Sequence, residues 1–176
     1  MYGYFALTNE YFATHRTGFA IMERFAVLGL VGLALTLCII AGEIDLSIGS
    51  NAALAAVVVV RFTDSLGAFP ALFIAVSIST LIGAIQGYFI AYLRVRAIVL
   101  TVGTLMLLRG VALFAAEEKT VMLTDFRVPD FISTKMLWYF SPASLLVIAM
   151  FVVVGLFMSY TRYGREIYAI GGARKE

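Results

Sequence analysis

Charged residues are scarce in this sequence, and their scarcity excludes most water-soluble proteins. Of the 176 residues, 14% are charged and 62% are hydrophobic, whereas an average globular protein is about 25% charged and about 45–50% apolar. A compact soluble domain has to cover its surface with polar groups, and this chain has too few of them. The composition excludes a soluble enzyme and a disordered chain, and it predicts an integral membrane protein embedded in a lipid bilayer.

Cysteine and histidine are nearly absent, which excludes several kinds of site. The chain has one cysteine, Cys38, one histidine, His15, and a net charge of +2. These residues form neither an intramolecular disulfide nor a metal site, and we expect no metal. A Gly-rich loop followed by Lys and Ser or Thr is missing, so we expect no nucleotide site, no other cofactor and no catalytic residues on this chain. The small net charge gives no reason to expect a nucleic acid as a partner.

Long apolar runs make up most of the chain. A helix needs about 20 mainly apolar residues to cross the roughly 30 Å of hydrocarbon in a bilayer. The runs predict an all-α fold, a polytopic transmembrane bundle of about five spans in one domain covering residues 1–176. The predicted spans are residues 25–42, 46–63, 70–93, 97–116 and 143–160.

The first two runs have two interpretations. In a hairpin, residues 42–45 form a tight turn between two helices, and the chain has five spans. In a broken helix, the chain leaves the helix within residues 42–49 and continues onward, so residues 25–60 are one discontinuous span and there are four. A continuous helix over those residues would be about 54 Å long, so the hairpin fits the bilayer better. Asp45 and Ser47 are also suited to capping the second helix.

Basic residues near the ends of the spans predict the orientation. Arg94 and Arg96 lie on the same side as the basic residues of the C-terminal segment, and together they outnumber the basic residues of the other side. We therefore expect residues 161–176 to be cytoplasmic and the polar segment 117–142 to be an external loop. Five spans then place residues 1–24 outside as well, which is natural if a further span precedes them.

Arg109 lies deep inside a predicted span. A charged residue at the centre of a membrane helix costs about 2.5–3.5 kcal/mol on insertion scales, and Arg109 is too far from either end to reach the surface easily. We expect it to face the interior of the bundle and to meet an acidic group or helix-end carbonyl groups. The alternative is a structural ion pair without a role in transport.

Small residues are spaced four apart in the span at 70–93. Ser79, Gly83 and Gly87 form a ridge that would let two helices approach closely. We expect this ridge to pack against another helix of the same chain; contact with a second copy is the alternative.

Three motifs occur in an order and at spacings that resemble the ribose-type (monosaccharide) ABC transporter permease family. The segment GEIDLSIGS at residues 42–50 is similar to the family's GGIDLSVGS. The segment TVGT at residues 101–104, followed by Arg109-Gly110, is similar to its TLGT…RG helix. The segment TRYGREIYAIGG at residues 161–172 is similar to its cytoplasmic pattern TxxGRxxYAxGGN. The resemblance runs from about residue 25 to residue 172.

The resemblance implies a membrane-spanning permease subunit of a binding-protein-dependent ABC importer in the inner (plasma) membrane, with a monosaccharide as solute. It implies three partners: a second permease copy in a homo- or heterodimer, a cytoplasmic ABC ATPase and an extracytoplasmic sugar-binding protein. ATP would be hydrolysed on the ATPase subunit, so this chain would not be an enzyme.

The resemblance also assigns two sets of residues. The signature residues near the translocation path are Asp45, Ser47, Gly49, Ser50, Arg109 and Gly110. The residues of the ATPase-coupling surface are Gly164, Arg165, Gly171 and Gly172.

The chain departs from the family pattern at a few positions. Glu43 replaces the usual second glycine, and Ala173 stands where Asn is common. Because the family's permeases begin earlier and continue further, we expect this chain to be an internal fragment that does not transport by itself. Two other functions stay open: a non-transporting accessory or regulatory membrane protein derived from half a permease, and a permease for another small neutral solute.

Overall fold

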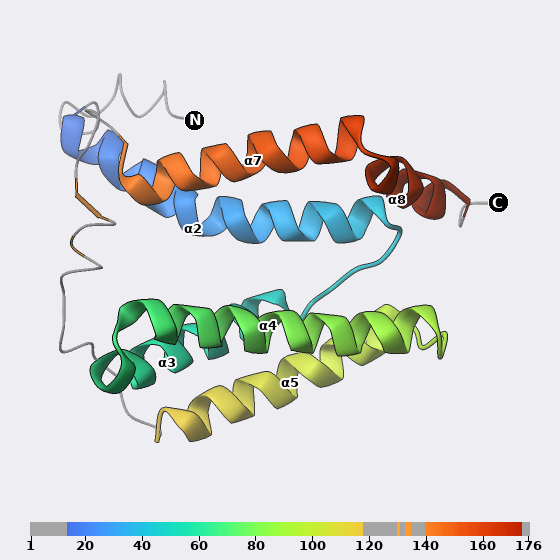
Figure 1. The fold of residues 1–176 in the computed structure, drawn as a ribbon, viewed down its shortest axis with the longest axis horizontal. Helices are drawn as coiled ribbons and strands as arrows, with labels where there is room; N and C mark the ends of the chain where they lie inside the picture. The colour runs from blue at the N-terminus through green and yellow to red at the C-terminus, as the bar shows by residue number, and fades with distance from the viewer. Residues whose placement is uncertain (1–13, 118–129, 131–132, 135–139, 174–176) are drawn as a thin grey trace. The chain divides into compact units, whose positions relative to one another are not determined.

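The computed structural model describes residues 14–117, 130, 133–134 and 140–173, and the regular structure in them is helical (Figure 1). The predicted all-α fold is confirmed. The helices are α2 (His15–Ile40), α3 (Ile48–Leu66), α4 (Ala68–Ala91), α5 (Ala97–Ala115), α7 (Pro142–Tyr160) and α8 (Arg162–Ala173).

Each predicted span coincides with one of these helices. Four of them, α2, α4, α5 and α7, are long and apolar enough to cross a membrane. The helix α3 is as long as α5 but contains Asn51, Arg61 and Asp64, which make it more polar. α2 begins at His15, earlier than residue 25, because an apolar run marks the part of a helix that a bilayer covers and not the helix end. The placement of the spans in a bilayer stays a prediction.

The chain divides into two units, which we describe separately. The first unit consists of Met1–Leu33 and Arg127–Glu166, and the second of Ala34–Phe126 and Ile167–Glu176. In the first, α2 contacts α7 at Gly29, where a Cβ would lie 3.3 Å from Val147. Nearby, the rings of Phe25 and Phe151 stack with centroids 6.2 Å apart.

In the second unit, α3 packs against both α4 and α5 (Figure 1). The buried core of this three-helix group consists of Leu54, Val58, Ala75, Leu108 and Ala112. α3 and α4 are joined by a single residue, Gly67, whose φ of 87° suits glycine because it has no Cβ. The two helices therefore run in opposite directions.

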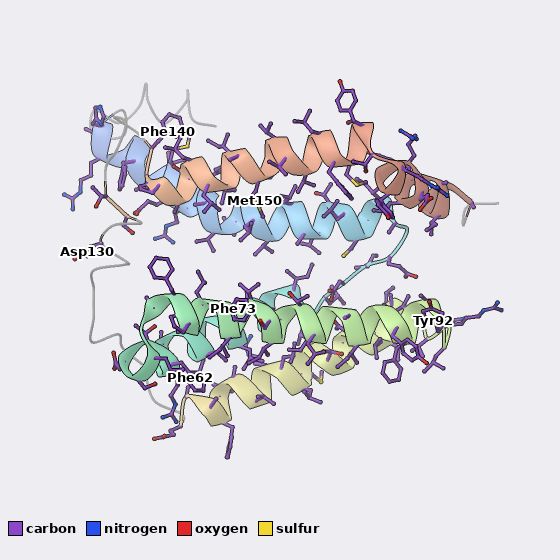
Figure 2. All side chains as sticks on the ribbon, in the orientation of Figure 1. Phe62, Phe73, Tyr92, Asp130, Phe140 and Met150 are labelled. Atoms are coloured by element: carbon purple, nitrogen blue, oxygen red, sulfur yellow. The ribbon has the colours of Figure 1, made fainter. Side chains whose placement is uncertain are left out.

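Most large apolar side chains in the described residues are exposed and not part of a core. Phe73 and Tyr92, labelled in Figure 2, are 74% and 77% exposed. Apolar surface of this extent would aggregate a soluble protein. It suits helices that are surrounded by lipid or by other membrane helices.

The predicted ridge on α4 is not the surface that packs within the three-helix group. A Cβ added to Gly83 or Gly87 meets no atom within 4 Å. α4 instead buries Ala71 and Ala75, and Ala75 belongs to the core. Within the three-helix group these two glycines therefore contact no other helix, and the expectation of packing within the chain stays a prediction. The reason is that small residues occur on more than one face of α4.

The chain leaves the helix between α2 and α3, as both interpretations of residues 42–49 require. The Gly42 amide donates to the Ile39 carbonyl and the Glu43 amide to the Cys38 carbonyl, each at 3.0 Å. This pair of bonds, with Gly42 at a φ of 80°, is the Schellman closure of a helix end. Residues 43–47 follow without helix until α3 begins. An uninterrupted helix is excluded, and the choice between hairpin and discontinuous span stays a prediction.

Candidate functional site

The polar residues of the first motif form a hydrogen-bonded network at the start of α3. Asp45 Oδ1 accepts hydrogen bonds from the Ser47 amide and from the Ser47 hydroxyl, both at 2.7 Å. The same hydroxyl accepts from Gln86 Nε2 of α4 at 2.9 Å. Ser47 is 1% exposed and Gln86 is 7% exposed. The network therefore attaches the segment before α3 to α4 through buried polar groups, which are strong determinants of a unique packing arrangement.

A second buried hydroxyl attaches this segment to α5. Thr101 is 1% exposed, and its Oγ1 donates toward the Ile44 carbonyl at 3.5 Å and the Ile98 carbonyl at 3.4 Å. The bond to Ile44 is long, but it is directed at a backbone group that no helix satisfies. Residues 43–47 are thus held by both α4 and α5.

The remaining signature residues differ in their surroundings. Ser50 is buried, whereas Gly49 is exposed and a Cβ there would meet nothing within 4 Å. Beside them, Asn51 Nδ2 donates toward the Ser79 carbonyl at 3.5 Å. Its Oδ1 is buried without a hydrogen-bond partner in the described part of the chain. The polar character of the motif therefore continues one turn into α3.

Arg109 lies on the side of α5 that faces away from the three-helix core. Its side chain is exposed, whereas Leu108 and Ala112 are buried in that core. Within the described residues Arg109 makes no hydrogen bond or ion pair, so the expected interior position and acidic partner are not found there. The helix period explains the outcome, because one face of α5 is already filled by contact with α3.

Gly110 lines a cavity of about 670 Å³ near the end of α5. Arg61 and Glu117, which also line it, form an ion pair. Arg61 Nε donates to the Ala115 carbonyl at 2.9 Å. This bond satisfies one of the free carbonyl groups at the C-terminus of the helix.

A second cavity, of about 840 Å³, lies where α5 begins. The non-helical segment of the first motif contributes Gly42, Glu43 and Ile44 to it. The turn between α4 and α5 contributes Arg94 and Arg96. The three-helix group therefore has a cavity with charged lining at each end of α5.

The glycine at the start of α8 is required by a close contact. A Cβ on Gly164 would lie 2.2 Å from the Met158 carbonyl oxygen, which is shorter than any real contact. The Gly164 amide donates to Thr161 Oγ1 at 3.1 Å, as expected for an N-terminal cap. Arg165, one position further, is exposed. Gly164 thus shapes the turn between α7 and α8. The Arg165 Nη1 group donates toward the Tyr160 carbonyl at 3.5 Å.

Gly171 and Gly172 have opposite surroundings. A Cβ on Gly171 would lie 1.9 Å from the carbonyl oxygen of Ile40, at the end of α2. A Cβ on Gly172 would meet nothing within 4 Å. Of the two glycines, Gly172 has open space where a Cβ would lie, whereas Gly171 packs against the backbone at the end of α2.

A comparison with known families identifies the chain. Residues 18–175 match the family model described as "Branched-chain amino acid transport system / permease component". The chain belongs to this family. The permease resemblance drawn from the three motifs is confirmed, because the family match covers all three of them.

Individual relatives in this permease family are similar to nearly the whole chain. The inner membrane ABC transporter permease protein YjfF of Escherichia coli K12 is 31% identical over 97% of this chain and 55% of the relative. The autoinducer 2 import system permease protein LsrC of Klebsiella pneumoniae is 35% identical over 94% of this chain and 48% of the relative. The L-arabinose transport system permease protein AraH of Escherichia coli K12 is 33% identical over 82% and 44%.

The chain thus spans about half the length of the curated relatives it matches. No solved structure matches the chain.

Sequence reasoning missed two residues of the network. Gln86 was not singled out, although an amide in the middle of an apolar run is a signal that it has a specific partner. Thr101 was recognised only as part of a motif. Neither residue is near Asp45 in sequence, and only the fold brings the three elements together.

Proposed function

We propose that these residues form part of the permease subunit of a binding-protein-dependent ABC importer in the inner (plasma) membrane. The observation that carries this proposal is the match of residues 18–175 to a permease family. The four helices that are long and apolar enough to cross a membrane support the location. So does the relative named as an inner membrane ABC transporter permease.

We propose a monosaccharide as the solute. Two relatives are named for an L-arabinose system and an autoinducer 2 system, whereas the family description names branched-chain amino acids. An amino acid carries one positive and one negative charge, and α4, α5 and α7 contain a single charged residue, Arg109. Because charges at membrane depth need partners of opposite sign, these three helices suit a neutral polar solute better than a zwitterion.

The proposed translocation path runs beside the network of Asp45 and Ser47 and along the Arg109 face of α5. An exposed arginine inside an apolar helix is too costly to face lipid. We therefore place this face against water in the path, or against acceptor groups of the protein beyond the described residues. Gly49, Ser50 and Gly110 belong to the same proposed path.

The proposed ATPase-facing element is α8. The predicted orientation puts this helix in the cytoplasm, and the exposed residues Arg165 and Gly172 would meet the ATPase there. Gly164 and Gly171 would hold the helix in position. A second permease copy, the cytoplasmic ABC ATPase and an extracytoplasmic sugar-binding protein complete the proposed importer, and ATP is hydrolysed on the ATPase subunit alone.

Uptake by cells tests the function. The reading frame that encodes these residues is deleted from the source genome, and uptake of radiolabelled ribose, arabinose, xylose, galactose and leucine is measured before and after restoring it. We expect uptake of one monosaccharide to fall to the background and leucine uptake to stay unchanged.

The other outcomes separate the alternatives. Loss of leucine uptake alone would replace the sugar by an amino acid and keep the permease. If every uptake rate stays unchanged, the sugar-permease proposal is wrong for these four sugars, and an accessory role becomes the better interpretation.

A further inference from the structure

Gly171 of α8 lies close against the backbone at the end of α2. Besides the contact with the Ile40 carbonyl oxygen, a Cβ on Gly171 would lie 3.0 Å from the Ile40 carbonyl carbon and 3.2 Å from that of Ala41. All three obstructing atoms belong to the backbone, so no side-chain rotation could relieve the contact. Any residue other than glycine would move either α8 or the end of α2.

The contacted backbone is the start of the segment that carries the first motif. The Schellman closure uses the carbonyl groups of Cys38 and Ile39, and Ile40 and Ala41 are the next residues along. From there the chain passes through Gly42 directly into residues 43–47. A displacement of Ile40 would therefore be passed to residues 43–47 through the turn at Gly42 alone.

The other end of the same segment is attached to the three-helix group. Gln86 of α4 holds Ser47, and Thr101 of α5 lies against the Ile44 carbonyl. Glu43 and Ile44 also line the cavity where α5 begins. The short segment between α2 and α3 is thus contacted by α8 at its start and by α4 and α5 further along, which makes it a continuous physical connection between them.

We infer that Gly171 is a positioning residue through which movement of α8 is passed to the Asp45–Ser47 network. The inference rests on the proposed function, because it takes α8 as the element that the ATPase moves. Gly172, although adjacent and identical in chemistry, has no part in this contact. The connection would let ATP-driven movement alter the start of α3 without any direct contact between the ATPase and the membrane helices.

Gly155 of α7 provides the control for Gly171. Gly171→Ala and Gly155→Ala each add a methyl group to a helix, and both remove the entropic disadvantage of glycine in a helix. A Cβ on Gly155 meets nothing within 4 Å in the described residues, and Gly155 belongs to neither the proposed path nor the proposed ATPase-facing surface. Each is introduced into the reading frame in its genome, and membranes are assayed for permease abundance, for ATP hydrolysis and for solute uptake. We expect Gly155→Ala to match the unmodified protein. We expect Gly171→Ala to keep ATP hydrolysis but to lower uptake per ATP hydrolysed about tenfold, the size of a typical coupling effect.

Cys38 provides a readout that does not depend on transport. It lies half-buried in the last turns of α2, beside the contacted backbone, and it is the only cysteine in the sequence. Its rate of labelling by a small maleimide is measured with the ATPase free and with the ATPase trapped by vanadate. We expect trapping to change the rate in the unmodified protein and in Gly155→Ala, and to leave it unchanged in Gly171→Ala.

The outcomes distinguish this inference from the proposed function. Should the unmodified protein show no uptake of any solute, the proposed function fails before either glycine is tested. If uptake is normal and the two variants behave alike, the inference about Gly171 is wrong and the function stands. If Gly171→Ala does not accumulate in membranes, the unmodified protein still tests the inference. A Cys38 labelling rate that is the same with the ATPase free and with the ATPase trapped would show that the inference is wrong.

Discussion

Residues of the same type have different roles in this chain, and the contact of each one decides which. Gly164 and Gly171 are held against backbone atoms, whereas Gly49, Gly110 and Gly172 have free space where a Cβ would be. All five belong to the three motifs. A motif therefore marks residues that are important to a family without stating whether a residue packs or is exposed.

The same point applies to the polar residues of the signature. Asp45, Ser47 and Ser50 stand close together in the sequence, but Ser47 is buried against Gln86, and its hydroxyl acts both as donor and as acceptor. The Asp45 carboxylate is occupied by the Ser47 hydroxyl and amide. In the described structure these groups hold the start of α3 in place. Any role beside the translocation path depends on that local structure.

Replacing Gln86 by leucine is expected to weaken the attachment of α3 to α4. Gln86→Leu removes the only donor that the structure shows for the buried Ser47 hydroxyl, and such a loss costs about 1 kcal/mol in a membrane protein. The free energy of unfolding of the purified permease in detergent measures the effect. Thr80→Val is the control, because Thr80 is exposed and bonds only to Val76 in its own helix. Equal stabilities of the two variants would contradict a role of Gln86 in the network.

At the scale of elements, the break between α2 and α3 is the feature that organises the second unit. It is closed by hydrogen bonds from the Gly42 and Glu43 amides to carbonyl groups in the last turn of α2, and side chains from α4 and α5 hold it. The apolar runs in the sequence predicted a break, since both interpretations of residues 42–49 contained one. The side chains that hold it were not predicted, because they come from other helices.

A pair of single cysteines distinguishes the hairpin from the discontinuous span. Cys38 is first replaced by serine, and Leu46→Cys and Gly49→Cys are then treated with a membrane-impermeant maleimide on intact and on inverted vesicles. These positions are chosen because both are exposed and neither has the positive φ of Gly42. We expect labelling from the cytoplasmic side only, as the hairpin requires.

The alternatives give different labelling patterns. Labelling from neither side would place the break inside the membrane and favour a discontinuous span. Arg94→Cys serves as the control for the cytoplasmic side, because the predicted orientation places the turn between α4 and α5 there. Labelling of Arg94→Cys from the outside would reverse the predicted orientation.

At the scale of the whole molecule, the chain covers about half the length of its relatives, and several surfaces in the described residues have no cover. The Arg109 face of α5 is exposed without a partner, and the Gly83 and Gly87 positions of α4 meet nothing. These faces are the places where further permease segments or a second copy would be expected to pack.

Sequencing the DNA around the coding region tests directly whether this chain is part of a longer permease. The DNA flanking the codons for Met1 and Glu176 is sequenced in the source organism. We expect the reading frame to continue on both sides into further apolar segments, since the relatives are about twice as long. A start codon and a stop codon framing these residues would contradict the fragment interpretation, and an accessory subunit would become the leading hypothesis.

The sequence by itself determined the class of protein, the positions of the helices and the family. Composition and apolar runs identify membrane helices because a bilayer imposes one length and one polarity on every span. The three motifs identify the family because their order and spacing can be read from the sequence without any knowledge of contacts. The tertiary structure alone decided which residues meet: Ser47 with Gln86, 39 positions apart, and Gly171 with Ile40. Spacing along a helix specifies which side chains share a face, but it does not specify which other helix that face contacts.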